Sequence, residues 1–190
     1  MITQLRISVI TLILFTFLMG LAYPLTVTGI AQWIFPYQAN GSLIEQDGQV
    51  IGSELIGQFF TDPKYFWGRP SATLPVPYNT AASSGSNIGP TNPALVQVIW
   101  ARIQALLSVD PGNNLLIPVD LVTASASGLD PHISVAAALY QMPRIARERG
   151  LSEEKVQLLV EQYTEDRQLG FLGEPRVNVL KLNMALNGLK

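Results

Sequence analysis

Cysteine is missing from this 190-residue sequence, and histidine occurs only once, as His132. Without cysteine the chain can form no disulfide, no Cys-ligated zinc site and no thiol nucleophile. One histidine cannot build a His-rich metal site, and the sequence contains no calcium loop, P-loop or G-x-G-x-x-G motif. The formal net charge of −2 provides no overall basic character, so nucleic acid is not an expected partner.

Charged residues are scarce as well, at 14% against roughly 25% in an average soluble domain. Much of this deficit lies at the N-terminus, because no charged residue occurs between Arg6 and Glu45 and residues 7–22 are almost entirely apolar. The hydrocarbon core of a bilayer needs about 20 such residues, so the pattern predicts a membrane anchor. The alternative is a cleaved signal peptide, for which Gly20 and Ala22 supply small residues at the expected positions.

Two features favour a retained anchor over a signal peptide. The apolar character continues to Phe35, and Trp33 and Tyr37 are aromatic residues of the kind enriched at membrane interfaces. Pro24 would kink or end a helix that begins near Ile2, which a membrane helix tolerates when the freed carbonyl finds a partner.

The charges that flank the apolar segment predict its orientation. Arg6 lies on the N-terminal side, whereas no Lys or Arg follows until Lys64, so the positive-inside rule places the N-terminus in the cytoplasm. We therefore expect an anchor and interfacial segment over residues 1–37 and one extracytoplasmic soluble domain over residues 38–190.

Local patterns in the remaining chain predict an α+β domain with a small sheet, formed by a hairpin and an edge strand, and about four helices. The hairpin is expected within residues 40–57 around Asp47-Gly48, and the edge strand over residues 115–125. Residues 61–93 contain too many prolines for regular structure. The helices are expected from Asn92-Pro93 to Leu107, from Asp130-Pro131 to Gly150 with a kink or break at Pro143, over 151–168 with Ser152 as cap, and over 177–189.

The stretch SASGLDPHIS (125–134) raises the question of catalysis, because it places Asp130 and His132 among serines. A membrane-anchored extracytoplasmic hydrolase could use Asp130, His132 and a serine. However, there is no G-x-S-x-G nucleophile motif, and Asp130-Pro131 also fits the cap of a helix. The structural interpretation is favoured, and no catalytic residue is expected.

A set of short motifs occurs in order along the chain and resembles one family, the C subunit of the Kdp-type potassium-transporting ATPase. The motifs are YPLTVTGIAQWIFPYQANGSLI (23–44), IGQFF (56–60), YFWGRPSAT (65–73), PYN (77–79), SSGSN (83–87), NPAL (92–95), VTASASGLDPHIS (122–134) and PRVNVLKLNMAL (175–186). None is diagnostic alone, but the ordered set covers nearly the whole chain.

The resemblance implies an accessory, non-catalytic subunit of a high-affinity potassium uptake pump in the bacterial inner membrane. Its implied partners are an ion-conducting A subunit, an ATP-hydrolysing B subunit, a small F subunit and, through the N-terminal helix, membrane lipid. ATP, magnesium and potassium would act through the other subunits, with no cofactor bound by this chain. Two roles are attached to such a subunit: raising the ATP affinity of the B subunit, or assembling and gating at the outer face of the A subunit. An outer domain without a phosphate-binding motif favours the second.

The residues that the resemblance singles out are expected to serve folding and interfaces, and none is given a catalytic role. They are Tyr65, Phe66, Gly68, Arg69, Pro70 and Ser71, then Ser83, Ser84, Gly85, Ser86 and Asn87, and finally Ser127, Gly128, Leu129 and Asp130.

A run without charge adds one more candidate interface. No Asp, Glu, Lys or Arg occurs from Ser71 to Ala101, although much of this segment should be loop. Charged residues are depleted and aromatic residues enriched in interface cores, which makes this segment and its Tyr78 a candidate docking surface. The alternative is that the loop folds back over its own domain.

Overall fold

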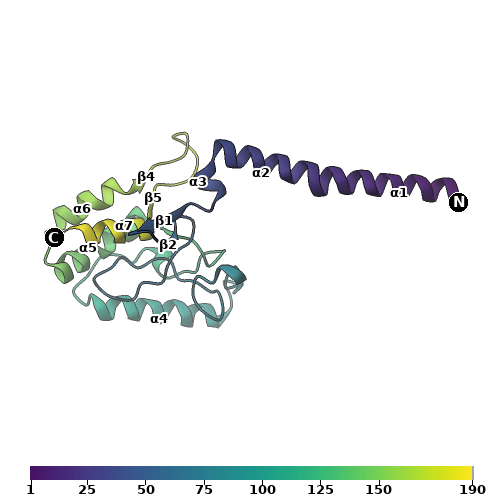
Figure 1. The fold of residues 1–190 in the computed structure, drawn as a ribbon. Coiled ribbons are helices and arrows are strands. Elements are labelled where there is room, and N and C mark those ends of the chain that lie inside the picture. Colours follow the sequence, from purple (N-terminus) through teal and green to yellow (C-terminus); the bar gives the residue numbers. More distant parts are fainter. Residues whose placement is uncertain (190) are drawn as a thin grey trace. The chain divides into compact units, whose positions relative to one another are not determined.

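The computed structural model describes residues 1–189, and its contacts divide the chain into two units, Met1–Ser53 and a second unit that begins at Glu54 (Figure 1). The first unit contains one long apolar helix and a hairpin, and the second contains the remaining helices and a separate sheet. The protein is therefore α+β, as predicted.

The long helix of the first unit consists of α1 (Ile2–Phe17), a π-helical turn (Leu18–Ala22) and α2 (Tyr23–Ile34). It spans 33 residues, and its most apolar stretch of 18 residues has a mean hydropathy of 2.2 and no buried residue, so it is long and apolar enough to cross a membrane. At about 1.5 Å per residue it measures roughly 50 Å, more than the hydrocarbon core requires. The helix continues through Pro24, because the preceding π-helical turn accommodates the missing N–H donor.

The predicted hairpin is confirmed. After the short α3 (Pro36–Ala39), β1 (Leu43–Gln46) pairs antiparallel with β2 (Gln49–Ser53), with Gln46 opposite Gln49. The two turn residues, Asp47 and Gly48, both have positive φ angles, 52° and 75°. This is the conformation that a two-residue hairpin turn demands and that an Asp-Gly pair accepts at low cost.

The second unit is built on a three-stranded antiparallel sheet and four α-helices. Its elements are a 3₁₀ turn (Thr80–Ala82), α4 (Pro93–Val109), a second 3₁₀ turn (Val119–Leu121), β3 (His132–Ser134), α5 (Val135–Arg149), α6 (Glu153–Gln162), β4 (Thr164–Glu165), β5 (Arg176–Asn178) and α7 (Val179–Gly188). The strand order is β3-β5-β4. Ile133 and Val177 lie opposite each other and are buried, so one face of this small sheet joins the core.

Several predicted helix ends are confirmed by their caps. Asn92 caps α4 through its side chain, Ser152 caps α6, and Gly150 ends α5 in the left-handed conformation with φ 65°. Pro143 does not divide α5, which continues from Val135 to Arg149. Pro143 costs α5 one backbone hydrogen bond, and packing of the surrounding helix outweighs this loss.

Other predicted elements were wrong. Residues 115–125 form no strand and contain only the 3₁₀ turn at 119–121, although Leu121 and Val122 are buried. The helix expected at Asp130-Pro131 begins at Val135, with Ser134 as its cap, because residues 132–134 pair with β5. The two later helices are also shorter, since residues 164–165 and 176–178 pair as strands. The hairpin and these strands form two separate sheets rather than one.

Three polar side chains inside the core hold the segment that carries Phe66. We call these residues, Gln141, Arg144 and Asn183, the clamp. The side chain of Asn183 in α7 accepts from the Phe66 N–H and donates to its carbonyl, both at 2.9 Å. Gln141 in α5 makes the same pair of bonds to Trp67, at 2.8 and 3.1 Å. Arg144, 1% exposed, donates to the carbonyls of Pro63 and Tyr65. These side chains satisfy a buried loop backbone that has no strand partner.

Asn183→Ala tests this clamp. It leaves the N–H and carbonyl of Phe66 unpaired in the core, and each such group costs about 1–3 kcal/mol, so the free energy of unfolding should fall by about 2–4 kcal/mol. Asn187→Ala on the same helix removes only an exposed contact to Arg149 and should change it by less than about 0.5 kcal/mol. Denaturant unfolding of the full chain in detergent measures both, and equal losses would contradict the clamp.

Candidate functional site

Three of the sequence motifs meet in one group of loops that are hydrogen-bonded to one another, which we call the loop cluster. Ser71 Oγ donates to the Gly128 carbonyl at 2.7 Å, and Ser84 N–H donates to the Ser127 carbonyl at 3.0 Å. Ser83 Oγ donates to that same Ser127 carbonyl at 3.0 Å. The segments around residues 65–71, 83–87 and 127–130 are therefore side by side in space, although they are far apart in the sequence.

Two glycines in this loop cluster allow the loops to approach one another closely. A Cβ on Gly128, whose φ is 67°, would lie 2.5 Å from the Thr73 side chain and 2.7 Å from the Ser84 carbonyl oxygen. A Cβ on Gly85 would lie 2.8 Å from the Ala126 carbonyl oxygen. Any larger residue would push the loops apart, so these positions are set by packing.

The Tyr78 side chain packs within the loop cluster and does not project freely into solvent. Its hydroxyl donates to the Arg69 carbonyl at 2.5 Å, and a Cβ on Gly57 or Gly68 would collide with its ring or hydroxyl group. Burial, with the nearby charge of Asp130, raises the pKa of Tyr78 to about 12. This side chain supports the alternative in which the loop folds back over its own domain. By contrast, Ser83, Ser84, Ser86 and Asn87 are exposed.

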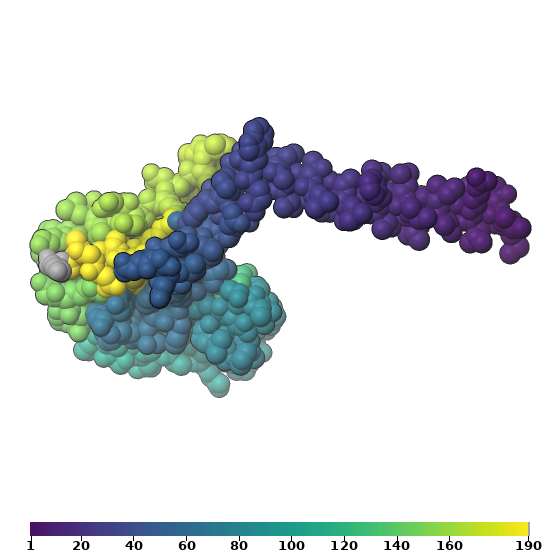
Figure 2. Space-filling view, viewed as in Figure 1, coloured from purple at the N-terminus to yellow at the C-terminus, as the bar shows by residue number. Residues whose placement is uncertain are grey.

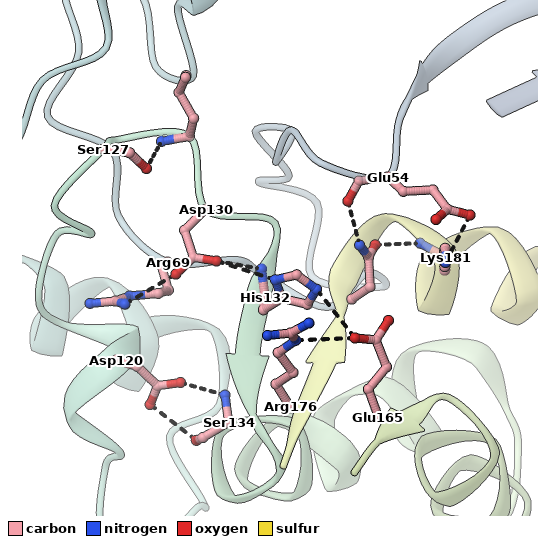
Figure 3. A network of polar contacts seen from close by, with 12 residues as sticks. Glu54, Arg69, Asp120, Ser127, Asp130, His132, Ser134, Glu165, Arg176 and Lys181 are labelled. Carbon is pink, nitrogen blue, oxygen red and sulfur yellow. Dashed lines mark hydrogen bonds and ion pairs between the residues drawn. The ribbon is translucent and has the colours of Figure 1, made fainter. Parts of the chain in front are cut away.

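Asp130 and His132 lie in a chain of polar and charged side chains (Figure 3). Arg69 Nη1 lies 3.1 Å from Asp130 Oδ2, and Asp130 Oδ1 accepts from the His132 backbone N–H at 3.0 Å. The His132 ring lies between two carboxylates, with Nδ1 3.5 Å from Asp130 and Nε2 3.8 Å from Glu165. Glu165 is paired in turn with Arg176 at 3.1 Å. The chain thus crosses all three strands of the sheet.

This arrangement lacks the nucleophile that a hydrolase would need. Ser134 is bound instead to Asp120, donating from Oγ at 3.2 Å and from its backbone N–H at 2.7 Å. Ser127 Oγ accepts from the Leu129 N–H. Within residues 1–189 no serine hydroxyl is hydrogen-bonded to the His132 ring, and no cluster of three His, Asp or Glu side chains could hold a metal ion. The geometry does not resemble a Ser-His-Asp triad.

The electrostatics of the network explain the state of Asp130. Burial favours a higher pKa for its carboxyl group, but hydrogen bonds from the His132 ring and backbone N–H, together with the charge of Arg69, outweigh burial and lower the pKa below its ordinary value. Asp130 is therefore charged at neutral pH and joins the 69–71 loop to β3. Its role in the fold is to anchor two segments.

Comparison with known proteins decides the family. A model of KdpC, the K+-transporting ATPase c chain, matches residues 5–188. The potassium-transporting ATPase KdpC subunit of Methylococcus capsulatus is 63% identical over 190 residues, all of both chains. That of Herpetosiphon aurantiacus is 64% identical over 188 residues, 99% of this chain and 97% of the relative. That of Sorangium cellulosum is 58% identical over the full length of both.

The chain belongs to the KdpC family. It is accordingly an accessory subunit of the potassium-transporting ATPase, and the resemblance noted in the sequence is confirmed. The hydrolase alternative finds no support, either in these relatives or in the surroundings of His132.

Sequence reasoning missed the clamp of Gln141, Arg144 and Asn183 that holds the Phe66 segment. One signal was present: Asn183 falls between Val179 and Leu186 at the spacing of the inward face of α7. A polar residue on such a face needs a buried partner, but only the fold shows that this partner is the Phe66 backbone.

Asp130→Asn tests the charge of the network while keeping an oxygen for the His132 N–H. A carboxyl group whose pKa is lowered by folding adds stability above its unfolded pKa, and this stability is lost as pH falls through the folded pKa. The variant should therefore melt below the wild type at pH 7, and the difference should close as pH falls below the ordinary Asp value of 3.8.

Melting of the full chain in detergent, followed by circular dichroism between pH 7 and pH 3, measures this difference. The exposed Asp166→Asn is the matched control and should show no such trend. A difference for Asp130→Asn that does not depend on pH would contradict the electrostatic role.

Proposed function

We propose that this chain is a non-catalytic subunit that assembles with the ion-conducting A, ATP-hydrolysing B and small F subunits and stabilises their complex. ATP, magnesium and potassium then act through those partners, and catalysis lies in the B subunit. The observation that carries the proposal is the polar network around His132: its acids and bases are tied to one another, and its serines are tied to the backbone and Asp120. Such a network can hold a fold, and within residues 1–189 no serine hydroxyl is hydrogen-bonded to the His132 ring.

A long uncharged surface supports a role in assembly. Residues 71–129 contain only three charged side chains, and each is used inside the domain. Arg102 donates to the Val122 carbonyl at 3.0 Å, Asp110 is 4% exposed and lies 2.8 Å from Arg147, and Asp120 binds Ser134. Core regions of protein interfaces are depleted in charge in the same way.

The family motifs then divide into two groups with different roles. Buried and half-buried members, among them Phe66, Gly68, Tyr78, Gly85 and Gly128, hold the loops together. The exposed members are available to partners: Ser83, Ser84, Ser86, Asn87 and Ser127.

The proposed topology places the N-terminus in the cytoplasm, the Ile2–Ile34 helix across the bacterial inner membrane as a single retained span, and the soluble domain outside. Support comes from Arg6, which flanks the helix on one side, and from the absence of Lys or Arg on the other side before Lys64. An outer domain cannot contact nucleotide bound in the cytoplasm. Any effect of this subunit on the ATP affinity of the B subunit is then indirect.

Cysteine labelling tests the topology, because the chain has no native cysteine. Gln49→Cys, exposed in the hairpin, should react in intact spheroplasts with a maleimide that cannot cross membranes. Thr3→Cys, at the other end of the helix, is the control and should react only after lysis. The reverse pattern would overturn the proposed orientation, and a Gln49→Cys chain recovered without its N-terminal helix would show cleavage.

Purification of the tagged full chain from membranes of potassium-limited cells tests the assembly. We expect stoichiometric recovery of the A, B and F subunits, identified by mass spectrometry. After separation in detergent, the chain alone should show no saturable ATP binding at millimolar nucleotide by calorimetry. Purification without these subunits would refute the proposed assembly, and a micromolar one-site isotherm would refute the indirect role in ATP affinity.

A further inference from the structure

Arg102 differs from every other arginine within residues 54–189, because no acidic side chain of the described chain lies beside it. Its Nη1 donates to the Val122 carbonyl at 3.0 Å, and this uncharged oxygen is its only partner. The other arginines all have acids nearby: Arg69 has Asp130, Arg147 has Asp110, Arg167 has Glu174, Arg176 has Glu165, Arg144 has Asp110 and Glu148, and Arg149 has Asp62.

The guanidinium group of Arg102 is partly buried as well as unpaired. Burial lowers its pKa, and no neighbouring carboxylate counteracts this effect. The group nevertheless stays charged at neutral pH, because an arginine does not lose its proton in a protein. Arginines that are withdrawn from water are usually paired with an acid, so the second unit leaves one positive charge without its usual counter-charge.

This charge lies in the wall of a groove of about 300 Å³ beside α4. Figure 2 shows α4, in teal, at the surface of its unit. Aromatic side chains from the loop before Arg69 form much of the remaining wall, namely Phe59, Phe60 and Trp67. Phe59 is 65% exposed, although it is a large apolar residue. The groove therefore combines one cation with an apolar, aromatic lining.

The guanidinium group of Arg102 still has donors for a ligand. It carries five N–H donors in a planar fork, and within residues 1–189 only Nη1 has an acceptor. Its other nitrogen atoms are not buried. The second arginine of the groove, Arg69, is already paired with Asp130, and its Nε is buried without a partner. The unbalanced positive charge of the groove therefore belongs to Arg102.

The groove matches one carboxylate on an apolar carrier. One unpaired guanidinium group balances one negative charge, and its planar fork fits a carboxylate through two parallel hydrogen bonds. A phosphate group, free or on a lipid, is usually held by several cations or by a helix N-terminus, whereas Arg102 lies in the middle of α4. A volume of about 300 Å³ is at the lower limit for small-molecule sites, which favours a protein side chain as the occupant.

We propose that an Asp or Glu side chain of another subunit of the same pump enters this groove and pairs with Arg102, while its apolar neighbours contact Phe59 and Trp67. The proposal rests on the proposed assembly and names the contact through which this chain recognises its partner. An arginine and aromatic residues at the centre of a contact, surrounded by uncharged surface, are typical of the residues that contribute most to binding. Here the uncharged surroundings are the run from Ser71 to Ala101.

Arg102→Gln tests the contribution of this charge to assembly. The shorter amide can still donate to the Val122 carbonyl, so the melting temperature of the chain in detergent should not fall. Recovery of the other subunits with the tagged chain should fall by about tenfold or more, because a desolvated carboxylate of the partner loses its counter-charge. Lys155→Gln removes the same charge from the exposed face of α6 and is the matched control, with recovery unchanged.

The results of this experiment separate the proposal from the proposed function. Normal recovery with Arg102→Gln would refute the contact and leave the proposed function standing. A melting temperature that falls together with recovery would assign Arg102 a role inside the domain and would also refute the contact. Failure of the wild-type chain to recover its partners would refute the proposed function itself.

Arg102→Lys identifies the occupant, because it keeps the positive charge and places an amine in the groove. In the assembled pump, a carbodiimide activates a carboxyl group, the amine displaces the activated oxygen to form an amide bond, and the reagent leaves as a urea. Peptide mapping by mass spectrometry should find position 102 joined to an Asp or Glu of another subunit. The wild-type pump is the control and should give no adduct at this position, because its guanidinium group is not acylated.

The nature of the adduct decides between sources of the negative charge. Position 102 joined to a small organic acid, to a second copy of this chain or to an acid of its own chain would overturn the proposal. A lipid phosphate or an inorganic phosphate leaves no amide, so absence of any adduct in an assembled Arg102→Lys pump would overturn it as well.

Discussion

The fold of the second unit depends on the pairing of a buried loop backbone with helix side chains. Phe66 is fully buried but lies in no strand, so its N–H and carbonyl must find partners in the core. Asn183 and Gln141 supply them with amide groups, whose donor and acceptor imitate the edge of a neighbouring strand. Arg144 adds two bonds to the preceding carbonyls and stacks on Trp67, with its guanidinium carbon 5.0 Å from the ring centre. The path of the chain from residue 63 to residue 70, and with it the position of Arg69, follows from these contacts.

Arg69, at the end of that segment, connects it both to the polar network around Asp130 and to the uncharged loop that carries Tyr78. Arg69 binds Asp130 and so fixes the turn before β3, while its carbonyl accepts from Tyr78. The three charged side chains within residues 71–129 are used inside the domain: Arg102 binds the Val122 carbonyl, Asp110 pairs with Arg147 and Asp120 binds Ser134. This internal use leaves little free charge on the surface from residue 71 to residue 129.

His132 illustrates how a catalytic pattern in a sequence can have a structural meaning. An aspartate two residues before a histidine, with serines nearby, is compatible with a triad, but a triad is a relation between side chains in space. Here the histidine ring faces two carboxylates, and the serines are occupied by Asp120 and by backbone groups. The KdpC relatives are subunits of a potassium-transporting ATPase, in agreement with this structural meaning.

The sequence by itself determined those parts of the structure that depend on interactions between neighbouring residues. The apolar helix, the Asp47-Gly48 hairpin, the caps at Asn92 and Ser152 and the left-handed end at Gly150 all depend on residues within a few positions, and the sequence predicted each of them. The ordered motifs also identified the family.

The sequence could not determine that residues 132–134, 164–165 and 176–178 would become one sheet, because strands this short are stabilised only by distant partners. For the same reason the sequence left open whether Tyr78 faces a partner or folds back over its own domain: its burial depends on Gly57 and Gly68, which the tertiary structure alone brings against its ring. The uncharged run beginning at Ser71 was visible from composition, but only the packing of α4 decided which of its side chains remain exposed.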